Sequence, residues 1–146
     1  MQIPSIDDFR HDPGTEYGPP WSAPVEGTSF ALTLPDGGAG DQVNGEWRPH
    51  GASYEIALAA LPQADSLREQ ALAFLARQVD FGKLGLQGEA SVSRITCDGR
   101  GKQQVTVELA WPGRTDVRLG VTFSWRMNHA QLPDLAWPFA LSCRFV

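Results

Sequence analysis

The sequence predicts an α+β domain in which one long amphipathic helix packs on one face of an antiparallel β-meander. The stretch "VRLGVTFSWRM", residues 117–127, alternates apolar with other side chains at every position, as a strand does when only one face lies on a core. Residues 66–79 instead place apolar side chains at helical spacing. Two further alternating segments follow this helix, and turns that contain glycine separate the strands.

We expect a single domain over residues 1–146, with an irregular arm at 1–28 and an α+β core at 29–146. A hydrophobic content of 42% with 20% charged residues is typical of globular and not of disordered chains. A folded chain of this length buries about 68–70% of the surface that its unfolded form exposes. It therefore needs neither a metal nor a disulfide to be stable, and we expect no cofactor.

The N-terminal part of the core follows a segment rich in turn residues. The segment "HDPGTEYGPPWSAPVEG", residues 11–27, holds four prolines and three glycines, which indicates an irregular arm. We expect its Trp21 and Tyr17 to cover one edge of the core. The alternation in "SFALTLP", residues 29–35, predicts the first strand. A short strand is also expected at "GEWRP", residues 45–49, where the proline limits pairing.

Residues 52–61, "ASYEIALAAL", are interpreted as the next strand. In an extended chain Tyr54, Ile56 and Leu58 would share one face. The alanines of this segment suit a helix as well, so periodicity leaves that alternative open. The segment ends at Pro62.

The strongest helix signal lies at residues 66–79. Ser66 is followed three residues later by Glu69, which is the pattern of a capping box. The pattern predicts an amphipathic helix of about four turns. We expect Phe74 to be buried against the sheet, as part of an apolar stripe that contains Leu67, Ala71, Phe74 and Leu75.

Three consecutive strands are predicted after the helix. The segments "GEASVSRITCDG" at 88–99 and "QQVTVELAW" at 103–111 alternate, and "DGRGK" and "PGRTD" supply the turns before the strand at 117–127. The C-terminal "LPDLAWPFALSCRFV", residues 132–146, is interpreted as a short helical turn followed by a last strand.

Charge and hydropathy exclude some classes of protein. A net charge of −5 with a pI near 5.1 argues against a non-specific nucleic-acid binder, which needs a basic face. The same balance is compatible with a basic protein partner. No run approaches the 18 apolar residues of a membrane span, and the start lacks the features of a secretory signal. We therefore expect no membrane span and a cytoplasmic location.

The residues with catalytic potential do not form a known motif. His11, Asp12 and Glu16 could supply zinc ligands, but a solvated arm explains the same residues better. Cys97 and Cys143 lack metal or redox spacing, so we expect two reduced thiols that do not bond to each other. A nucleophilic pair of either cysteine with a distant histidine is less common than an inert thiol. We expect that the protein is not an enzyme, although a site assembled from distant residues stays open.

The polar side of the central strands is the candidate site. Polar residues of 104–108 can lie beside those of 118–126 across an antiparallel pair. Such a face is either a solvated surface, with cross-strand pairs worth roughly 0.2–1 kcal/mol each, or a surface that binds a protein, where arginine is enriched. If the face binds a protein, the predicted partner-binding residues are Gln104, Glu108, Arg118, Thr122, Ser124 and Arg126.

Two segments, "FALTLPDGGAGDQVN" and "SYEIALAALPQADSLREQALAFLARQVDFGKL", resemble the Eag effector-adaptor family of bacterial type VI secretion. That family belongs to a wider group of PsbP-like and DcrB-like α/β folds. The ending "ALSCRFV" is also similar to the closing strand of the family. The similar positions are Leu34, Pro35, Asp36 and Gly37; Asp41 and Asn44; Leu61 and Pro62; and Arg77 and Gln78.

The resemblance implies an antiparallel sheet with the helix of residues 66–79 packed on it. It also implies a cytoplasmic, usually dimeric adaptor that holds the N-terminal transmembrane segments of a toxin before secretion. We therefore expect a non-enzymatic accessory protein that binds a secreted toxin, with homodimer formation left open. The alternatives are a cognate immunity protein that neutralises a toxin and, in another class, a small enzyme.

Overall fold

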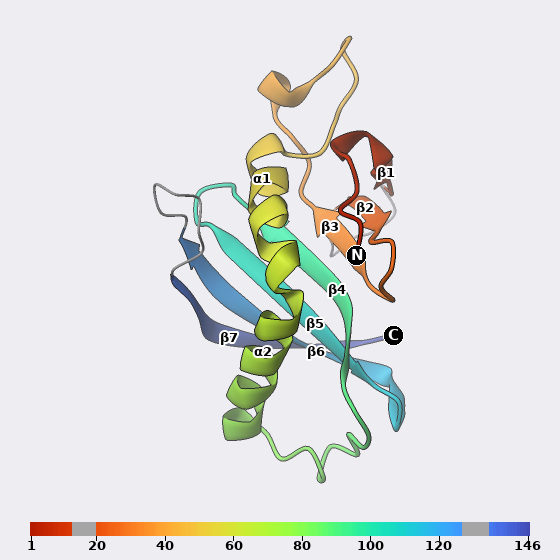
Figure 1. Cartoon of the computed structure of the whole chain (residues 1–146), viewed down its shortest axis with the longest axis vertical. Helices are drawn as coiled ribbons and strands as arrows, with labels where there is room; N and C mark the ends of the chain where they lie inside the picture. The colour runs from red at the N-terminus through yellow and green to blue at the C-terminus, as the bar shows by residue number, and fades with distance from the viewer. Residues whose placement is uncertain (13–19, 127–134) are drawn as a thin grey trace.

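The computed structural model describes residues 1–12, 20–126 and 135–146. Figure 1 shows a twisted sheet with two helices, arranged end to end, along one side of it. The helices are α1 (Gly51–Ala60) and α2 (Ala64–Gln78), joined by the 3-10 turn η3 (Leu61–Gln63), and two more 3-10 turns are η1 (Ile6–Asp8) and η2 (Ala39–Asp41). The strands are β1 (Arg10–His11), β2 (Trp21–Pro24), β3 (Ala31–Leu34), β4 (Ser91–Asp98), β5 (Gln104–Trp111), β6 (Arg114–Arg126) and β7 (Leu135–Phe145).

The seven strands form one sheet in the order of the sequence, from β1 to β7. Every neighbouring pair is antiparallel except β3 and β4, which are parallel. A parallel pair needs a long crossover connection, and α1 with α2 supplies it. The α+β fold with helices on one face of a mostly antiparallel sheet is thus confirmed.

The expectation of a strand at residues 52–61 is wrong, because this segment forms α1. His50 caps the helix, since its Nδ1 accepts a hydrogen bond of 3.2 Å from the backbone N–H of Ser53. Alanine has the best intrinsic helix propensity and loses no side-chain entropy. The buried side chains follow helical spacing, at Ser53, Ile56, Ala57 and Ala60.

The second helix starts earlier than the capping box predicts, at Ala64. Because α1 and η3 lead directly into α2, the backbone at Ser66 is already helical and leaves no free N-terminus to cap. The Ser66 hydroxyl accepts a hydrogen bond from the Gln70 side chain instead, at 3.1 Å. The helix itself is confirmed, but its predicted cap is wrong.

The core lies between the helices and one side of the sheet. Leu67, Ala71 and Leu75 of α2 are fully buried. Phe74 is only half-buried at the border of this core, so the expectation of a buried Phe74 is only partly correct. The predicted alternation of the strands is confirmed, because their buried apolar positions include Val105, Val107, Leu109, Val117, Leu119, Val121, Phe123 and Trp125.

Parts of the N-terminal arm are ordered strand. β1 and β2 add two short strands beside β3, so the description of residues 1–28 as irregular is wrong for these elements. Trp21 packs against the core and its Nε1 donates a hydrogen bond of 2.8 Å to Asp36. The other aromatic residue expected there, Tyr17, lies outside the described residues.

Two smaller expectations have different outcomes. Residues 45–49 form no strand, and only isolated bridges join Val43 to Glu46 and Asp36 to Pro49. The last strand is confirmed as β7. The helical turn expected before it falls largely on residues 127–134, which are outside the described part of the chain.

Candidate functional site

On β5 and β6 the predicted site residues alternate with the buried apolar residues that face the helices, so they lie on the other side of the sheet, which we call the polar face. The strand register places Gln104 opposite Ser124 and Thr106 opposite Thr122. The hydroxyls of the two threonines lie 2.9 Å apart, in hydrogen-bond contact. The sequence therefore predicted this pairing of β5 with β6 correctly.

The six predicted residues do not form one point-like site. Arg118 and Arg126 are eight residues apart on β6, which corresponds to about 26 Å at 3.3 Å per residue. Glu108 lies towards the Arg118 end, while Gln104 and Ser124 lie towards the Arg126 end. Thr122 lies between the two groups. The polar face thus has two ends with different chemistry.

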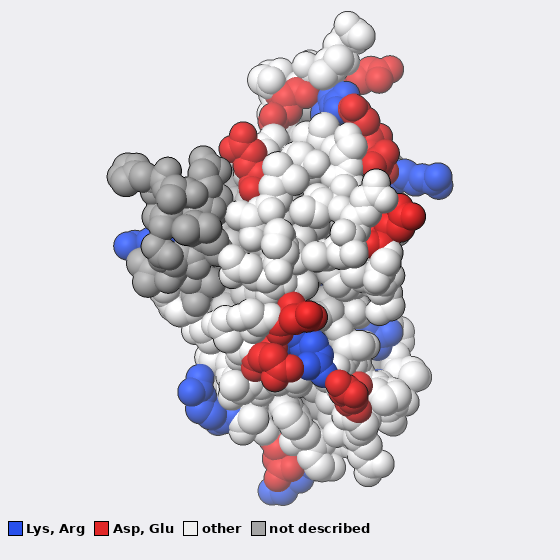
Figure 2. Space-filling model, viewed as in Figure 1, with Lys and Arg blue, Asp and Glu red and all other residues white. Residues whose placement is uncertain are grey.

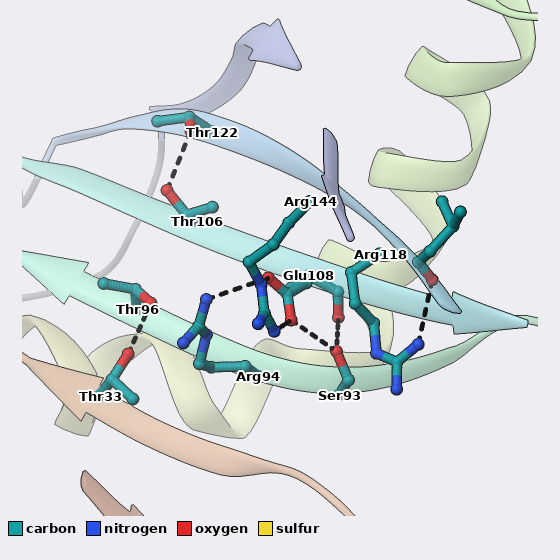
Figure 3. Close-up of polar contacts among 10 residues, drawn as sticks. Thr33, Ser93, Arg94, Thr96, Thr106, Glu108, Arg118, Thr122 and Arg144 are labelled. Carbon is teal, nitrogen blue, oxygen red and sulfur yellow. Dashed lines mark hydrogen bonds and ion pairs between the residues drawn. The ribbon is translucent and has the colours of Figure 1, made fainter. Parts of the chain in front are cut away.

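At the first end, Glu108 is the centre of a cluster (Figure 3). Its carboxylate accepts two hydrogen bonds from Arg144, at 3.1 Å from Nε and 2.7 Å from Nη2. Arg94 donates through Nη2 at 3.1 Å, and the Ser93 hydroxyl donates at 3.1 Å. The sequence predicted that Glu108 lies on an open surface, but these neighbours leave the residue only 8% exposed to solvent.

The protonation state of Glu108 follows from these contacts. Burial alone raises the pKa of Glu108, but the hydrogen bonds from Arg144 and Ser93, together with the charges of Arg94 and Arg144, outweigh it and lower the pKa below its ordinary value. The same contact has the opposite effect on its partner, because the hydrogen bond to Glu108 raises the pKa of Arg144. The carboxylate is therefore ionised at neutral pH, and it is not poised to act as a proton donor.

A glycine makes the cluster possible. Gly120 on β6 lies directly between Glu108 on β5 and Ser142 on β7. Because Gly120 has no side chain, Arg144 reaches from β7 across β6 to Glu108. A Cβ added at Gly120 would lie 2.5 Å from the Ser142 hydroxyl oxygen.

Arg118 lies in the same region but has different partners. It neighbours Ala110 of β5 and Arg144 of β7. Its Nη1 donates to the backbone carbonyls of Thr115, at 2.9 Å, and Val117, at 3.0 Å. These bonds hold the guanidinium beside its own strand without neutralising its charge.

The second end of the polar face combines a cation with aromatic side chains. The Arg126 guanidinium lies 5.6 Å from the ring centroid of Trp137, within the range of a cation–π contact. A shallow depression there is lined by Lys102, Gln103, Gln104, Ser124, Trp125, Arg126, Trp137 and Phe139. Trp137 is 41% exposed and Phe139 is 50% exposed, so both present apolar surface to solvent.

Sequence reasoning missed the partners that β4 and β7 contribute, notably Arg94, Arg144 and Trp137. A bulge between Val92 and Arg94 interrupts the alternation of β4, but from Arg94 onward period two places Arg94 and Thr96 on the face away from Ile95 and Cys97, so this part of the sequence did contain a signal for Arg94. The register of β7 could not be read in the same way, because it shifts between Thr122 and Phe123 of β6.

The other candidate residues are dispersed. The ring of His11 lies 4.7 Å from that of Trp21, and Glu16 is not among the described residues. Within residues 1–12, 20–126 and 135–146, no group of three His, Cys, Asp or Glu residues could hold a metal ion.

The two cysteines lie on different strands, Cys97 on β4 and Cys143 on β7. Two strands separate them, so at about 4.8 Å per strand they are at least about 14 Å apart. A disulfide needs Cα atoms within about 7 Å. Cys97 is fully buried and burial raises its pKa, which disfavours the reactive thiolate.

Comparison with family models, with curated proteins and with solved structures finds no match to this chain. In the described part of the chain, no helix is both long and apolar enough to cross a membrane.

Proposed function

We propose that this chain is a non-enzymatic accessory protein that binds a protein partner with its polar face. The observation that carries the proposal is the set of arginine and aromatic side chains fixed along that face, at Arg94, Arg118, Arg144, Arg126 and Trp137. Arginine and tryptophan are enriched at protein interfaces and among the residues that dominate binding energy.

The sequence resemblance supports an adaptor of bacterial type VI secretion, which would hold a toxin in the cytoplasm before export. An α+β sheet with helices on one face agrees with the fold that the resemblance implies, but a shared fold does not by itself identify a function.

A cognate immunity protein is the second candidate. An adaptor that grips transmembrane segments needs an apolar surface, whereas the Glu108 cluster makes one end of the polar face charged. That charge favours a polar toxin surface, as an immunity protein would recognise. The two roles differ in the partner, because the adaptor's toxin carries N-terminal apolar segments.

Self-association is a further part of the proposal. β7 ends the sheet, and it carries Leu141 and Phe145, which are 42% and 71% exposed. A long apolar edge strand can pair with another chain, which supports a homodimer through β7. Light scattering of the purified protein tests this proposal, and a monomer at micromolar concentration contradicts it.

The binding proposal can be tested with the tagged chain expressed in the bacterium that encodes it. We expect one co-purifying toxin in a stoichiometric amount, identified by mass spectrometry, and a complex that re-forms from the purified components. The double variant Arg118→Ala, Arg126→Ala should bind it on the order of thirtyfold more weakly, because interface arginines often contribute about 2 kcal/mol.

Arg77→Ala is the matched control, since Arg77 is an exposed arginine on α2, on the other side of the sheet. It should leave the affinity unchanged. If the complex forms equally well with the double variant, the polar face is not the binding surface. The exposed Val43 and Trp47 of the 35–50 loop would then be the next candidates.

A further inference from the structure

We propose that the arginine cluster around Glu108, made of Arg94, Arg118 and Arg144, binds an acidic segment of the partner through its carboxylates. This inference rests on the proposed function, because it names the partner chemistry for one end of the polar face.

The cluster carries a local positive charge. Three arginines and one glutamate give it a net charge of +2, on a chain whose net charge is −5. The neighbouring charges at the strand ends occur in pairs that nearly cancel, Arg114 with Asp116 at 3.3 Å and Arg100 with Asp98 at 3.1 Å. Figure 2 shows, in contrast, many acidic side chains over the surface that the helices carry. A negatively charged segment is therefore attracted to this part of an otherwise acidic protein.

The arginines retain donors for a ligand. A guanidinium has five N–H donors. Two nitrogens of Arg144 and one nitrogen of Arg94 donate to Glu108. Arg118 donates from Nη1 to backbone carbonyls. Among the ion pairs of the described residues, none involves Arg118. A carboxylate that arrives from the partner can thus be held bidentately by donors of this cluster.

The donors are also fixed in advance. Glu108 is 8% exposed, while the side chains of Arg94 and Arg144 that grip it are 29% and 45% exposed. The buried carboxylate holds the two guanidinium groups at the surface, so little rotamer freedom remains to be lost on binding. Glu108 therefore acts as a positioning residue for the two arginines that meet the ligand.

A carboxylate-bearing peptide fits this cluster better than a nucleic acid does. A polyanion needs an extended basic surface to release its counterions, and the net charge of −5 opposes that mode of binding. A short acidic segment can bind through its carboxylates to the three guanidinium groups of this cluster alone.

The test uses a fluorescein-labelled Gly/Ser peptide with four glutamates, its four-glutamine and four-lysine counterparts, and a single-stranded DNA oligonucleotide. Fluorescence anisotropy at low and moderate salt measures their affinity for the full chain. We expect binding of the glutamate peptide only, weakened by salt. Side-chain NMR signals of the arginine Nε–H groups should shift for Arg94, Arg118 and Arg144.

Three variants locate the contact. Arg118→Ala should weaken binding of the glutamate peptide at least about tenfold, because this arginine has no carboxylate partner of its own in the described structure. Arg77→Ala, on α2, is the matched control and should change nothing. Glu108→Gln leaves Arg94 and Arg144 without the carboxylate that positions them, so at moderate salt it should weaken peptide binding several-fold, provided that circular dichroism and the NMR spectrum show an intact fold.

Equal binding of the glutamine peptide, stronger binding of the DNA, or an unchanged affinity in Arg118→Ala would overturn the inference. The outcome is separable from that of the proposed function. If the toxin binds to the polar face and the glutamate peptide does not bind, only this inference fails. If the peptide binds through Arg118 and no toxin is found, the proposed function fails instead.

Discussion

The two faces of the sheet are built from the same strands, but different forces hold their side chains. On the helix side, Val107 and Val121 are fully buried opposite each other. On the polar face, the neighbouring Thr106 and Thr122 meet through their hydroxyls. Burial of a Val or Leu side chain stabilises a fold by about 1.5–3 kcal/mol, whereas a polar cross-strand pair contributes roughly 0.2–1 kcal/mol.

This difference teaches where changes can be tolerated. The helix side has little freedom, because each buried residue fills space that its neighbours cannot easily refill. The polar face contributes less to the fold, so its residues are freer to serve a partner. The predictions below test this contrast, from the largest expected effect to the smallest.

Thiol reactivity should show the largest contrast. By register both cysteines project to the helix side, Cys97 opposite Val105 and Cys143 opposite Leu119. Cys97 is buried, but Cys143 is exposed because it lies on the edge strand β7. We expect one thiol per chain, Cys143, to react rapidly with a thiol reagent in the native protein, and both thiols to react rapidly in denaturant. Native Cys97 should react at least about a thousandfold more slowly than Cys143, because its modification requires opening of the core.

A colourimetric thiol assay with and without denaturant measures the number of reactive thiols and their rates of modification. Two fast thiols in the native protein would show that the helix side is open at β4. No free thiol under denaturing, non-reducing conditions would mean that the cysteines are oxidised. Elemental analysis of the same sample should find no stoichiometric zinc.

Truncation of the helix core should give the next largest effect. Leu75→Ala removes a fully buried side chain and should lower the free energy of unfolding by about 2–5 kcal/mol. Phe74→Ala should cost less, about 1–2 kcal/mol, because Phe74 is only partly buried. Urea denaturation of both variants measures the difference, and a larger loss for Phe74→Ala would show that α2 presents a different face to the sheet.

Glu108→Gln tests the buried charge at the centre of the arginine cluster. Loss of the carboxylate should lower the free energy of unfolding by about 1–3 kcal/mol, since two arginines lose their charged acceptor. The folded pKa of Glu108 lies below its unfolded value. Its stabilisation is therefore complete above the unfolded pKa, about 4.3, and is lost as the pH falls through the folded pKa.

Urea denaturation at several pH values between about 3 and 7 measures this dependence. The wild type should lose more stability than Glu108→Gln as the pH falls below about 5. Burial raises the pKa of Asp98, but the hydrogen bonds from Arg100, together with the charges of Arg100 and His50, lower it below its ordinary value. Asp98 contributes equally in both proteins. Parallel pH profiles of wild type and variant would contradict the assignment to Glu108.

The smallest effect on stability is expected for Arg118→Ala combined with Arg126→Ala. Neither side chain is buried or forms an ion pair with another described residue. The double variant should unfold within about 0.5 kcal/mol of wild type, while binding of the partner weakens as proposed above. A loss above about 1 kcal/mol would mean that these arginines serve the fold.

The sequence allowed prediction of the features that depend on local periodicity. Alternation along residues 117–126 identified β6 and both of its faces, and helical spacing identified α2. The same reasoning failed at α1, because alternating and helical patterns are hard to separate over ten alanine-rich residues. The capping box at Ser66 also failed, since tertiary packing makes α1 and α2 nearly continuous.

The Glu108 cluster depends on information that no local pattern contains. Arg144 reaches Glu108 because β7 pairs with β6 so that Arg144 lies opposite Arg118, and because Gly120 leaves the path open. The resulting contact joins two side chains that are 36 positions apart in the sequence. The sequence could therefore identify Glu108 and Arg118 as polar-face residues, but it could not identify what surrounds them.

The parallel pairing of β3 with β4 divides the sheet into two meanders, β1–β3 and β4–β7. β3 and β4 pair over a short register of three positions, Ala31–Arg94, Leu32–Ile95 and Thr33–Thr96, with a hydroxyl contact of 2.6 Å between the threonines. Such a short seam is a natural boundary between cooperative folding units. Amides of β2 and β3 should therefore exchange with deuterium through a partial opening, at lower free energy than those of β5 and β6, whose exchange requires the whole domain to unfold.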